Sequence, residues 1–338
     1  MSERNIITGM GAALVDLFAD VSEATLAELG SEKASMALVD AAQSAAMQEK
    51  LTVHTHQPGG SSANSIAGIA ALGLKAGFIG KLADDALGQI FCDDFDRLGV
   101  HFPHQKQNAT ALPTGHCLVL LTPDGERTMH TVLGAAVTTQ PQDVDAELIS
   151  NTGLFFAEGY IWDSPTAKQA FLQAAESVRA QGGKVAFSLA DGFCVERHHA
   201  DFIALLDSHI DIVLANETEI AALFGSQEPA EIAAKFAAHN ILGAVTYGAE
   251  GAYVFDPTHD DTQAHMAHVP AQKIDDIVDL TGAGDQFAAG FLAALQKGQS
   301  PEKAAAIGII AASEVIRHVG PRPQSDITAR LSESGLSL

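Results

Sequence analysis

The sequence predicts an α/β protein with three layers, in which helices cover both faces of a mostly parallel central sheet. Short apolar runs typical of strands alternate with longer amphipathic stretches typical of helices along most of the chain. Hydrophobic residues make up 47% of the 338 residues and charged residues 18%, which is typical of a chain with a large packed core. No repeat or Pro/Gly-rich linker divides the chain, so we expect a single domain over residues 1–338.

The alternation of strands and helices is clearest in the second half of the chain. Strands are predicted over residues 153–158, 184–188, 211–215 and 243–247. Helices are predicted over residues 165–181, 217–224 and 229–239. Near the start, Ile6 and Ile7 indicate one strand, and residues 15–21 alternate as a second strand would. Open parallel sheets bind ligands at the carboxyl ends of their strands, so polar residues at those ends are candidates for a site.

Two stretches interrupt this alternation, at residues 34–57 and 111–133. Both contain β-prone runs, for example at residues 51–55. In the second stretch, the turn-forming residues 123–126 separate two such runs, which indicates a hairpin. We expect these strands to form a small β-subdomain at one edge of the large one, where it would act as a lid.

Charge and composition exclude several classes of protein. The net charge of −23 argues against nucleic acid and anionic membrane surfaces as partners, because both require a basic patch. The longest apolar runs are too short to span a bilayer, and the N-terminus has no basic-then-apolar leader. The histidines lack metal-ligand spacing, and the cysteines are too widely spaced to suggest a disulfide framework: Cys92, Cys117 and Cys194. We therefore expect a cytoplasmic protein.

The strongest functional signal is a glycine-rich segment, residues 279–285, that leads into an apolar helix. We expect residues 277–278 to form a short strand before it. Gly282 and Gly284 allow the backbone to approach a ligand, and amides at a helix N-terminus favour an anion. A carboxylate at Asp285 would repel a bound phosphate unless it accepts a proton from a hydroxyl that attacks it. The alternative is a glycine turn in which Asp285 only caps the helix.

A second segment suits a ligand rich in hydroxyls. Gly59 and Gly60 precede a small, polar helix start, and Asn64 offers both a donor and acceptors. The alternative is an ordinary helix, predicted over residues 66–72 and capped by Ser61 or Ser62.

The third and fourth segments follow predicted strands. Residues 216–219 supply the hard oxygen ligands that hydrated Mg²⁺ prefers, although a helix start with acidic residues against its dipole explains them equally well. Asp16 follows a glycine pair, Gly9 and Gly11, and is placed at a strand end where it could bind hydroxyls; a surface aspartate is the alternative. This is not a dinucleotide fingerprint, because Leu14 stands in place of the third glycine.

Taken together, the four segments resemble the ribokinase-like (PfkB) family of carbohydrate and nucleoside kinases, over nearly the whole chain and in the expected order. Residues 279–285 match its C-terminal signature, and residues 59–64 match its N-terminal one. Residues 216–219 match its Asn-x-x-Glu motif, and residues 245–252 resemble its strand and turn beside the nucleotide. Leu280 departs from the family, which usually has Thr at this position.

The resemblance implies an ATP-dependent kinase with the three-layer fold and lid of that family. Asp285 would be the catalytic base, beside an anion hole formed by the amides of Gly282, Ala283 and Gly284. Hydroxyls of the acceptor would be held by Asp16, Gly59, Gly60 and Asn64. ATP would lie against Asn216, Thr246, Gly248 and Gly251, with Mg²⁺ bound through water near Glu219. The family also often has a monovalent-cation site near the residue that corresponds to Asp279, which would hold K⁺.

The acceptor is predicted to be a nucleoside, with adenosine preferred. Residues 122–129, 158–162 and 314–323 look most like the adenosine-kinase-like branch of the family. A base needs a flat apolar slot, which Phe18, Tyr160 and Trp162 would wall unless they belong to the core. The alternatives are a sugar kinase of the ribokinase or fructokinase type, a non-catalytic nucleotide- or sugar-binding protein on the same fold, and a dinucleotide oxidoreductase. An exposed lid edge would also allow two subunits to pair as a homodimer.

Overall fold

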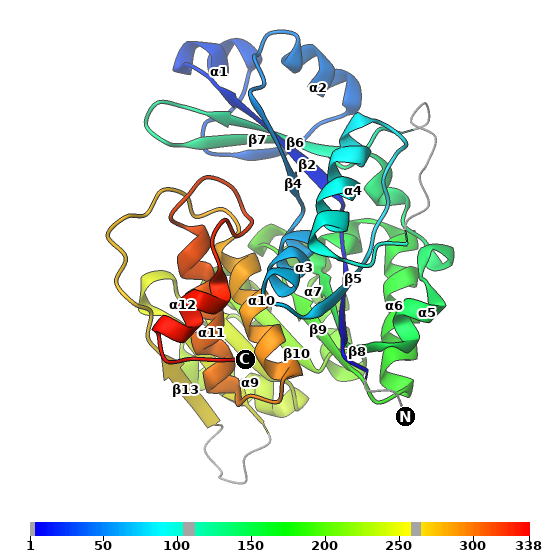
Figure 1. Cartoon of the computed structure of the whole chain (residues 1–338), viewed down its shortest axis with the longest axis vertical. Helices are drawn as coiled ribbons and strands as arrows, with labels where there is room; N and C mark the ends of the chain where they lie inside the picture. Colours follow the sequence, from blue (N-terminus) through cyan, green and yellow to red (C-terminus); the bar gives the residue numbers. More distant parts are fainter. Residues whose placement is uncertain (1–3, 104–111, 258–264) are drawn as a thin grey trace.

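The computed structural model describes residues 4–103, 112–257 and 265–338. Figure 1 shows an α/β body with a smaller β-subdomain, the lid, above it. The first residue of the predicted lid segment 111–133 and the N-terminal residues 1–3 lie outside the described residues. No helix in the described ranges is long and apolar enough to cross a membrane.

The body is built on an eight-stranded sheet in the order β13-β12-β11-β10-β9-β8-β1-β5. Its strands are β1 (Ile6–Met10), β5 (Lys75–Ile79), β8 (Thr152–Glu158), β9 (Lys184–Ser188), β10 (Ile212–Asn216), β11 (Leu242–Thr246), β12 (Ala252–Asp256) and β13 (His265–Val269). The pairs from β5 through to β11 are parallel, whereas β12 and β13 are antiparallel at one edge. The predicted mostly parallel sheet is confirmed.

Helices cover both faces of the sheet, which confirms the predicted three layers (Figure 1). One face is covered by α3 (Ser61–Ala71), α10 (Ala283–Gln296), α11 (Pro301–Val315) and α12 (Ile327–Glu333). The other is covered by α5 (Ala146–Ser150), α6 (Pro165–Ala180), α7 (Gly192–Ser208), α8 (Glu217–Phe224) and α9 (Pro229–His239). Glycines allow α10 and α11 to pack closely: a Cβ on Gly290 of α10 would lie 2.8 Å from the Cα of Gly308 on α11. Short 3₁₀ turns lie at η1 (Gly134–Thr138), η2 (Pro141–Asp143), η3 (Gly159–Asp163) and η4 (Gly248–Glu250).

The lid is a five-stranded sheet in the order β3-β7-β6-β2-β4. Its strands are β3 (Met36–Leu38), β7 (Arg127–Val132), β6 (Gly115–Leu121), β2 (Leu14–Asp20) and β4 (Thr55–Gly59). Buried side chains on one face, such as Leu17 and Leu118, join the core beneath α1 (Glu23–Leu29), α2 (Ala41–Gln48) and α4 (Ala86–Leu98). The strand period of two places Asp16 and Phe18 on the opposite face, which is turned toward the body (Figure 1).

Two short connections carry the chain between the lid and the body. Three residues, 11–13, separate β1 of the body from β2 of the lid. A single residue, Gly60, separates β4 of the lid from α3 of the body. Both connections lie beside the predicted acceptor residues, so the boundary between the two parts runs through the candidate site.

Three expectations for local structure are wrong. The strand predicted at residues 51–55 begins only at Thr55 and runs to Gly59, and the following helix starts at Ser61 instead of residue 66. Ile277 and Val278 form no strand. Their side chains are 55% and 59% exposed, and the Val278 amide donates to the Ile316 carbonyl at 2.8 Å instead of joining a sheet. β-propensity alone could not form a strand there without a neighbouring strand.

Candidate active site

The floor of the candidate site is held by a buried carboxylate, Glu158, at the carboxyl end of β8. One oxygen accepts the Ala12 amide at 2.8 Å and the other accepts the Ser62 amide at 2.6 Å. Burial raises the pKa of Glu158 to about 7, although these two hydrogen bonds oppose the shift. Glu158 therefore ties the β1–β2 connection to the first turn of α3. Sequence reasoning assigned it no role; the only signal was a charged residue at the end of an apolar strand.

The glycine pair brings the lid and the body into close contact. Gly60 has φ of 93°, which favours glycine, and a Cβ there would overlap the carbonyl oxygen of Ala12. A Cβ on Gly59 would lie 2.7 Å from Oδ2 of Asp16. Because Gly59 has no side chain, the Asp16 carboxylate can lie close to the end of β4. Gly60 is also the N-cap of α3, so neither Ser61 nor Ser62 caps this helix as the alternative required.

Asp285 lies in the first turn of α10 and contacts the first turn of α3. Its Oδ1 accepts the Ser61 hydroxyl at 2.7 Å, and its Oδ2 accepts Nδ2 of Asn64 at 2.9 Å. Burial is the largest influence and raises the pKa of Asp285 to about 6, against the lowering effect of these two bonds. The structure thus brings together two predicted residues more than two hundred positions apart, and adds Ser61, whose predicted part was only that of a cap.

The glycine-rich segment leaves the start of α10 open. Gly282 is the N-cap with φ of 79°, and a Cβ there would lie 2.6 Å from the Cα of Pro321. Asp285 is therefore not the cap of this helix. The Ala283 amide donates to the Leu280 carbonyl at 3.2 Å. Because Gly282 has no side chain to accept the amide that follows, the backbone at Gly284 can face an anion. No atom would lie within 4 Å of a Cβ on Gly284, so this part of the backbone borders open space.

Asp16 lies on the lid face that is turned toward the body. Burial raises its pKa to about 7, and the positive charges of Arg322 and Arg127 oppose that shift. Arg322 also donates from Nε to Oδ1 of Asn64 at 3.3 Å. The two arginines were not predicted as site residues, although both lie in segments that look like the adenosine-kinase-like branch.

Asn216 and Glu219 form the start of α8, at the carboxyl end of β10. The Asn216 side chain accepts the amides of Thr218 and Glu219, both at 2.9 Å, and the Glu219 carboxylate accepts the Asn216 amide at 3.1 Å. This capping box is the helix-start alternative considered for these residues. Burial, reinforced by the charges of Asp191 and Asp285, raises the pKa of Glu219 to about 8.

The other predicted nucleotide residues lie at the neighbouring strand end. Thr246 ends β11 and pairs with Asn216 in the parallel sheet. Gly248 and Gly251 flank the turn η4 with φ of 52° and 106°, and a Cβ on Gly251 would overlap the carbonyl oxygen of Val269. Within the described ranges, no three His, Cys, Asp or Glu side chains gather as metal ligands.

Asp279 connects the glycine-rich segment to the lid. Its carboxylate accepts the amides of Thr281 and Gly320, both at 2.9 Å, and pairs with the guanidinium of Arg127 on β7. Arg127 also donates to the Thr281 hydroxyl. The Asp279 side chain is only 3% exposed, so its charge is neutralised by an arginine that comes from the lid.

The aromatic residues proposed as walls of a base slot have different surroundings. Trp162 lies in the core against Phe171, Phe187 and Phe202, and its indole N–H donates to Asp201 at 3.0 Å, which confirms the core alternative given for this residue. Tyr160 instead lines a narrow, mostly apolar pocket beside Glu158, together with Gly11, Leu133, Ala136 and Ile161. Phe18 lies on the body-facing side of the lid with Cys117, Val119 and Met129.

Comparison with known proteins places this geometry among sugar and nucleoside kinases. A family model described as pfkB family carbohydrate kinase matches residues 33–328. The crystal structure of a probable sugar kinase from Rhizobium etli CFN 42 is 35% identical with a TM-score of 0.90, over 99% of this chain and 100% of that one. Adenosine kinase from Sinorhizobium meliloti is also 35% identical, with a TM-score of 0.89 over 98% and 99%. An Arabidopsis thaliana ribokinase is 31% identical over 276 residues, 78% of this chain and 68% of its own length.

Proposed function

This chain belongs to the pfkB family of carbohydrate kinases, and we propose that it transfers the γ-phosphoryl group of ATP to a hydroxyl of a nucleoside, with adenosine preferred. The observation that carries this proposal is the Asp285 carboxylate at the open start of α10, held by Ser61 and Asn64. A base at that point can take the proton of an acceptor hydroxyl while the backbone at the start of α10 faces the phosphoryl group.

The proposed reaction is an in-line displacement. The acceptor oxygen forms a bond to the γ-phosphorus, the bond between that phosphorus and the β–γ bridging oxygen breaks, and ADP leaves. Asp285 accepts the proton of the attacking hydroxyl. The amides of Gly282, Ala283 and Gly284 would stabilise the charge on the phosphoryl oxygens, which matters in a chain with a net charge of −23.

We propose that Asp16, Gly59, Gly60 and Asn64 orient the acceptor. The Asp16 carboxylate accepts hydrogen bonds only, whereas Asn64 can donate and accept, so together they suit adjacent hydroxyls. The absence of side chains at Gly59 and Gly60 would let the acceptor lie against the backbone. Glu158 would act through the backbone that it holds at Ala12 and Ser62.

The nucleotide would lie against Asn216, Thr246, Gly248 and Gly251, with Mg²⁺ near Glu219. The buried Glu219 carboxyl is kept from ionising partly by nearby acidic side chains, a repulsion that a cation would relieve. Its oxygens already accept bonds from Asn216, so contact through water fits better than direct coordination. Bound Mg²⁺ would supply positive charge to the phosphates of ATP.

A bound K⁺ is not needed to balance the charge of Asp279, because Arg127 already pairs with that carboxylate. We therefore propose that turnover is independent of monovalent cations. Equal rates in potassium and tetramethylammonium chloride at matched ionic strength are expected, and strong activation by K⁺ would contradict this.

The nucleoside preference rests on apolar surfaces next to the proposed hydroxyl site. The pocket beside Glu158 is walled by Leu133, Ala136 and Ile161, and the body-facing side of the lid carries Phe18 and Met129. A bare sugar would leave these surfaces unused, whereas a base would cover them. A simple sugar acceptor is the second candidate, because the Rhizobium etli protein, at the same 35% identity, is described as a probable sugar kinase.

We also propose a cytoplasmic protein, because the three cysteines are buried and form no disulfide, which suits a reducing compartment: Cys92, Cys117 and Cys194. Pairing of two lids in a homodimer is favoured by Met36 and Leu38 on the edge strand β3, which are 47% and 58% exposed. The mass of the protein in solution, measured by light scattering, tests the pairing; a monomer at micromolar concentration would contradict it.

The test of the kinase is ADP release from ATP–Mg²⁺ across adenosine, inosine, guanosine, ribose, fructose and fructose 6-phosphate. Asp285→Asn is expected to keep the fold and lose at least about a hundredfold in turnover, because the amide cannot accept the proton. Asp275→Asn, at an 81% exposed side chain, is the matched control and should leave turnover unchanged. Normal turnover in Asp285→Asn would refute the role of the base. ATP binding without turnover on any acceptor would favour the non-catalytic alternative.

A further inference from the structure

Arg322 is a buried arginine whose hydrogen-bonding capacity is not used up by the protein. It follows α11 in the C-terminal loop, and its side chain is 13% exposed. Nη1 pairs with Asp94 on α4, and Nε donates to Oδ1 of Asn64 at 3.3 Å. Nη2 is buried and has no hydrogen-bond partner among the described residues. A buried guanidinium donor without a partner is costly, so the site calls for an oxygen that is not part of the chain.

The guanidinium is held rigidly at this place. Its Cζ lies 5.3 Å and 5.7 Å from the ring centroids of Phe95 and Phe91 on α4. The backbone next to it is fixed by Gln286, whose side-chain amide donates to the carbonyl oxygens of Pro321 and Asn64, both at 3.0 Å. The same amide therefore connects the loop of Arg322 to α10 and α3. Such a donor is oriented before any ligand arrives.

The surroundings of Arg322 point to a hydroxyl as the missing partner. The positive charge of Arg322 lies close enough to Asp16 to lower the pKa of that carboxyl, while burial acts in the opposite direction. None of the described residues donates a hydrogen bond to the Asp16 side chain. In its ionised form this carboxylate can only accept, while the unpartnered Nη2 of Arg322 can only donate. A hydroxyl does both, so one hydroxyl, or two adjacent ones, satisfies both groups at once.

We propose that Arg322 binds the acceptor and determines its specificity, by donating from Nη2 to a hydroxyl oxygen of the sugar ring that also bonds Asp16. This inference rests on the proposed acceptor site and adds a residue that was not predicted as part of it. A ring that lacks this hydroxyl leaves both a buried guanidinium donor and a buried carboxylate unsatisfied. Sites that hydrogen-bond a substrate hydroxyl reject analogues without it far more strongly than apolar pockets reject a missing methylene.

The experiment compares adenosine with 2′-deoxyadenosine and 3′-deoxyadenosine, by turnover and by calorimetric binding. In the natural protein, at least one deoxy analogue is expected to lose about a hundredfold or more in kcat/KM. In Arg322→Gln and Arg322→Met, the ratio of kcat/KM for adenosine to kcat/KM for that deoxy analogue should fall to about tenfold or less. The reason is that adenosine loses the hydrogen bond that the analogue never made. A merely structural arginine would lower both rates together and leave the ratio unchanged, and that result would overturn the proposal.

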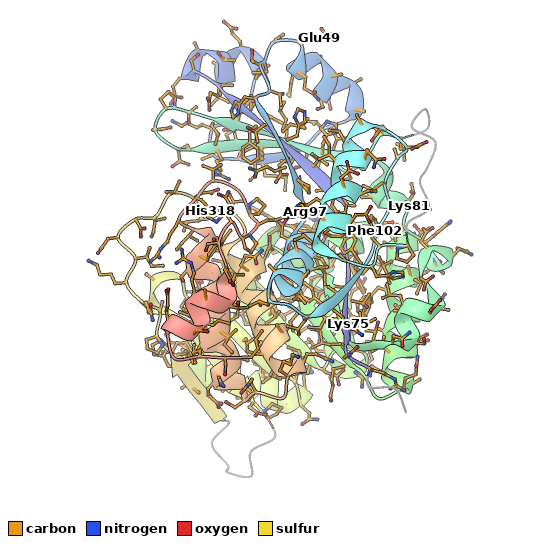
Figure 2. The ribbon with its side chains drawn as sticks, in the orientation of Figure 1. Glu49, Lys75, Lys81, Arg97, Phe102 and His318 are labelled. Carbon is orange, nitrogen blue, oxygen red and sulfur yellow. The ribbon has the colours of Figure 1, made fainter. Side chains whose placement is uncertain are left out.

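Arg97 provides a matched control, because it pairs with the other oxygen of Asp94 at 2.6 Å but is 69% exposed; it is labelled in Figure 2. Arg97→Gln should leave both the rates and the ratio unchanged. If neither Arg322 variant folds, the natural protein still decides: equal use of adenosine and both deoxy analogues overturns the proposal. Turnover with an unchanged ratio refutes the role of Arg322 but keeps the kinase. If the protein discriminates between the compounds in binding through Arg322 but shows no turnover, the role of Arg322 is kept and the kinase proposal is refuted. If none of the three compounds binds, both proposals are overturned.

Discussion

Glu219 provides a test of how the charge in the site affects stability. Its pKa is raised to about 8 in the folded chain from 4.5, mainly by burial. Between these values the native carboxyl holds a proton that the unfolded chain has released, so a rising pH favours unfolding. The stabilisation is fully present below pH 4.5 and is lost as the pH rises through 8. Each pH unit in that window is worth about 1.4 kcal/mol, or about 3 kcal/mol between pH 5 and pH 7.5.

Glu219→Gln removes this titration while keeping a residue that can serve at the same position of a capping box. The free energy of unfolding would be measured with urea from pH 5 to pH 8, without nucleotide. Other buried acids in the site also titrate, so the natural protein should show a steeper fall than one group alone would cause. The free energy of unfolding of Glu219→Gln should fall less steeply with pH than that of the natural protein, with the slopes differing by about 1.4 kcal/mol per pH unit.

The control is Glu217→Gln, in the same first turn but only half-buried, which should keep the natural slope. Adding ATP–Mg²⁺ to the natural protein should also flatten the slope, because a cation beside Glu219 favours its ionised form. If the slopes of Glu219→Gln and the natural protein agree within error, burial does not suppress ionisation of Glu219 and the argument fails.

Three further predictions concern the catalytic base, the glycine pair and the lid. Turnover should fall about tenfold per pH unit below pH 6, where Asp285 becomes protonated. The hydrogen bond from Ser61 lowers the pKa of Asp285, so Ser61→Ala should raise that pKa and move the fall in turnover to higher pH. An unchanged pH profile in this variant would contradict the prediction. Gly60→Ala should lower the free energy of unfolding by at least about 2 kcal/mol, because it combines strain at positive φ with atomic overlap. Gly99→Ala, at φ of 70° with open space around it, should lower it by only about 1 kcal/mol. Urea unfolding compares the two variants, and equal losses would contradict the contribution of the overlap. Arg127→Gln should destabilise the protein by about 3 kcal/mol and speed amide exchange in the lid hairpin, because it leaves a buried carboxylate unpaired; unchanged exchange would show that the ion pair does not hold the lid.

The large elements of the fold could be predicted because they depend on local patterns. The amphipathic period of residues 165–181 and the apolar runs at 153–158 and 184–188 are visible within a few residues. The prediction failed where the partner of a segment decides its structure. Ile277 and Val278 have strand composition but meet no strand, and Trp162 looks like a ligand wall but lies in an aromatic core.

The candidate site could be predicted segment by segment, but its contacts could not. Asp285 and Asn64 each stand in a distinctive motif, yet nothing local says that their side chains meet. Glu158 and Arg322 were given no role because each acts on a segment far away in the chain, where neither composition nor spacing records the contact. The four motifs mark the backbone that surrounds the proposed ligand. Glu158 and Arg322 lie in other segments, which resembled a branch of the family without indicating which side chains act in the site.

The two connections between lid and body have a consequence for changing the specificity of this kinase. Residues 11–13 and Gly60 carry the chain across the boundary, and the same residues border the proposed acceptor site. A rotation of the lid would change backbone torsions at these positions, as it would at the longer connections before β6 and after β7. A substitution that reshapes the pocket there would therefore also shift the angle at which the lid rests. Selection for a new acceptor at these positions would act on opening and closing as well, whereas positions within the body, such as Ile161 and Ala167, could alter the pocket without altering the hinge.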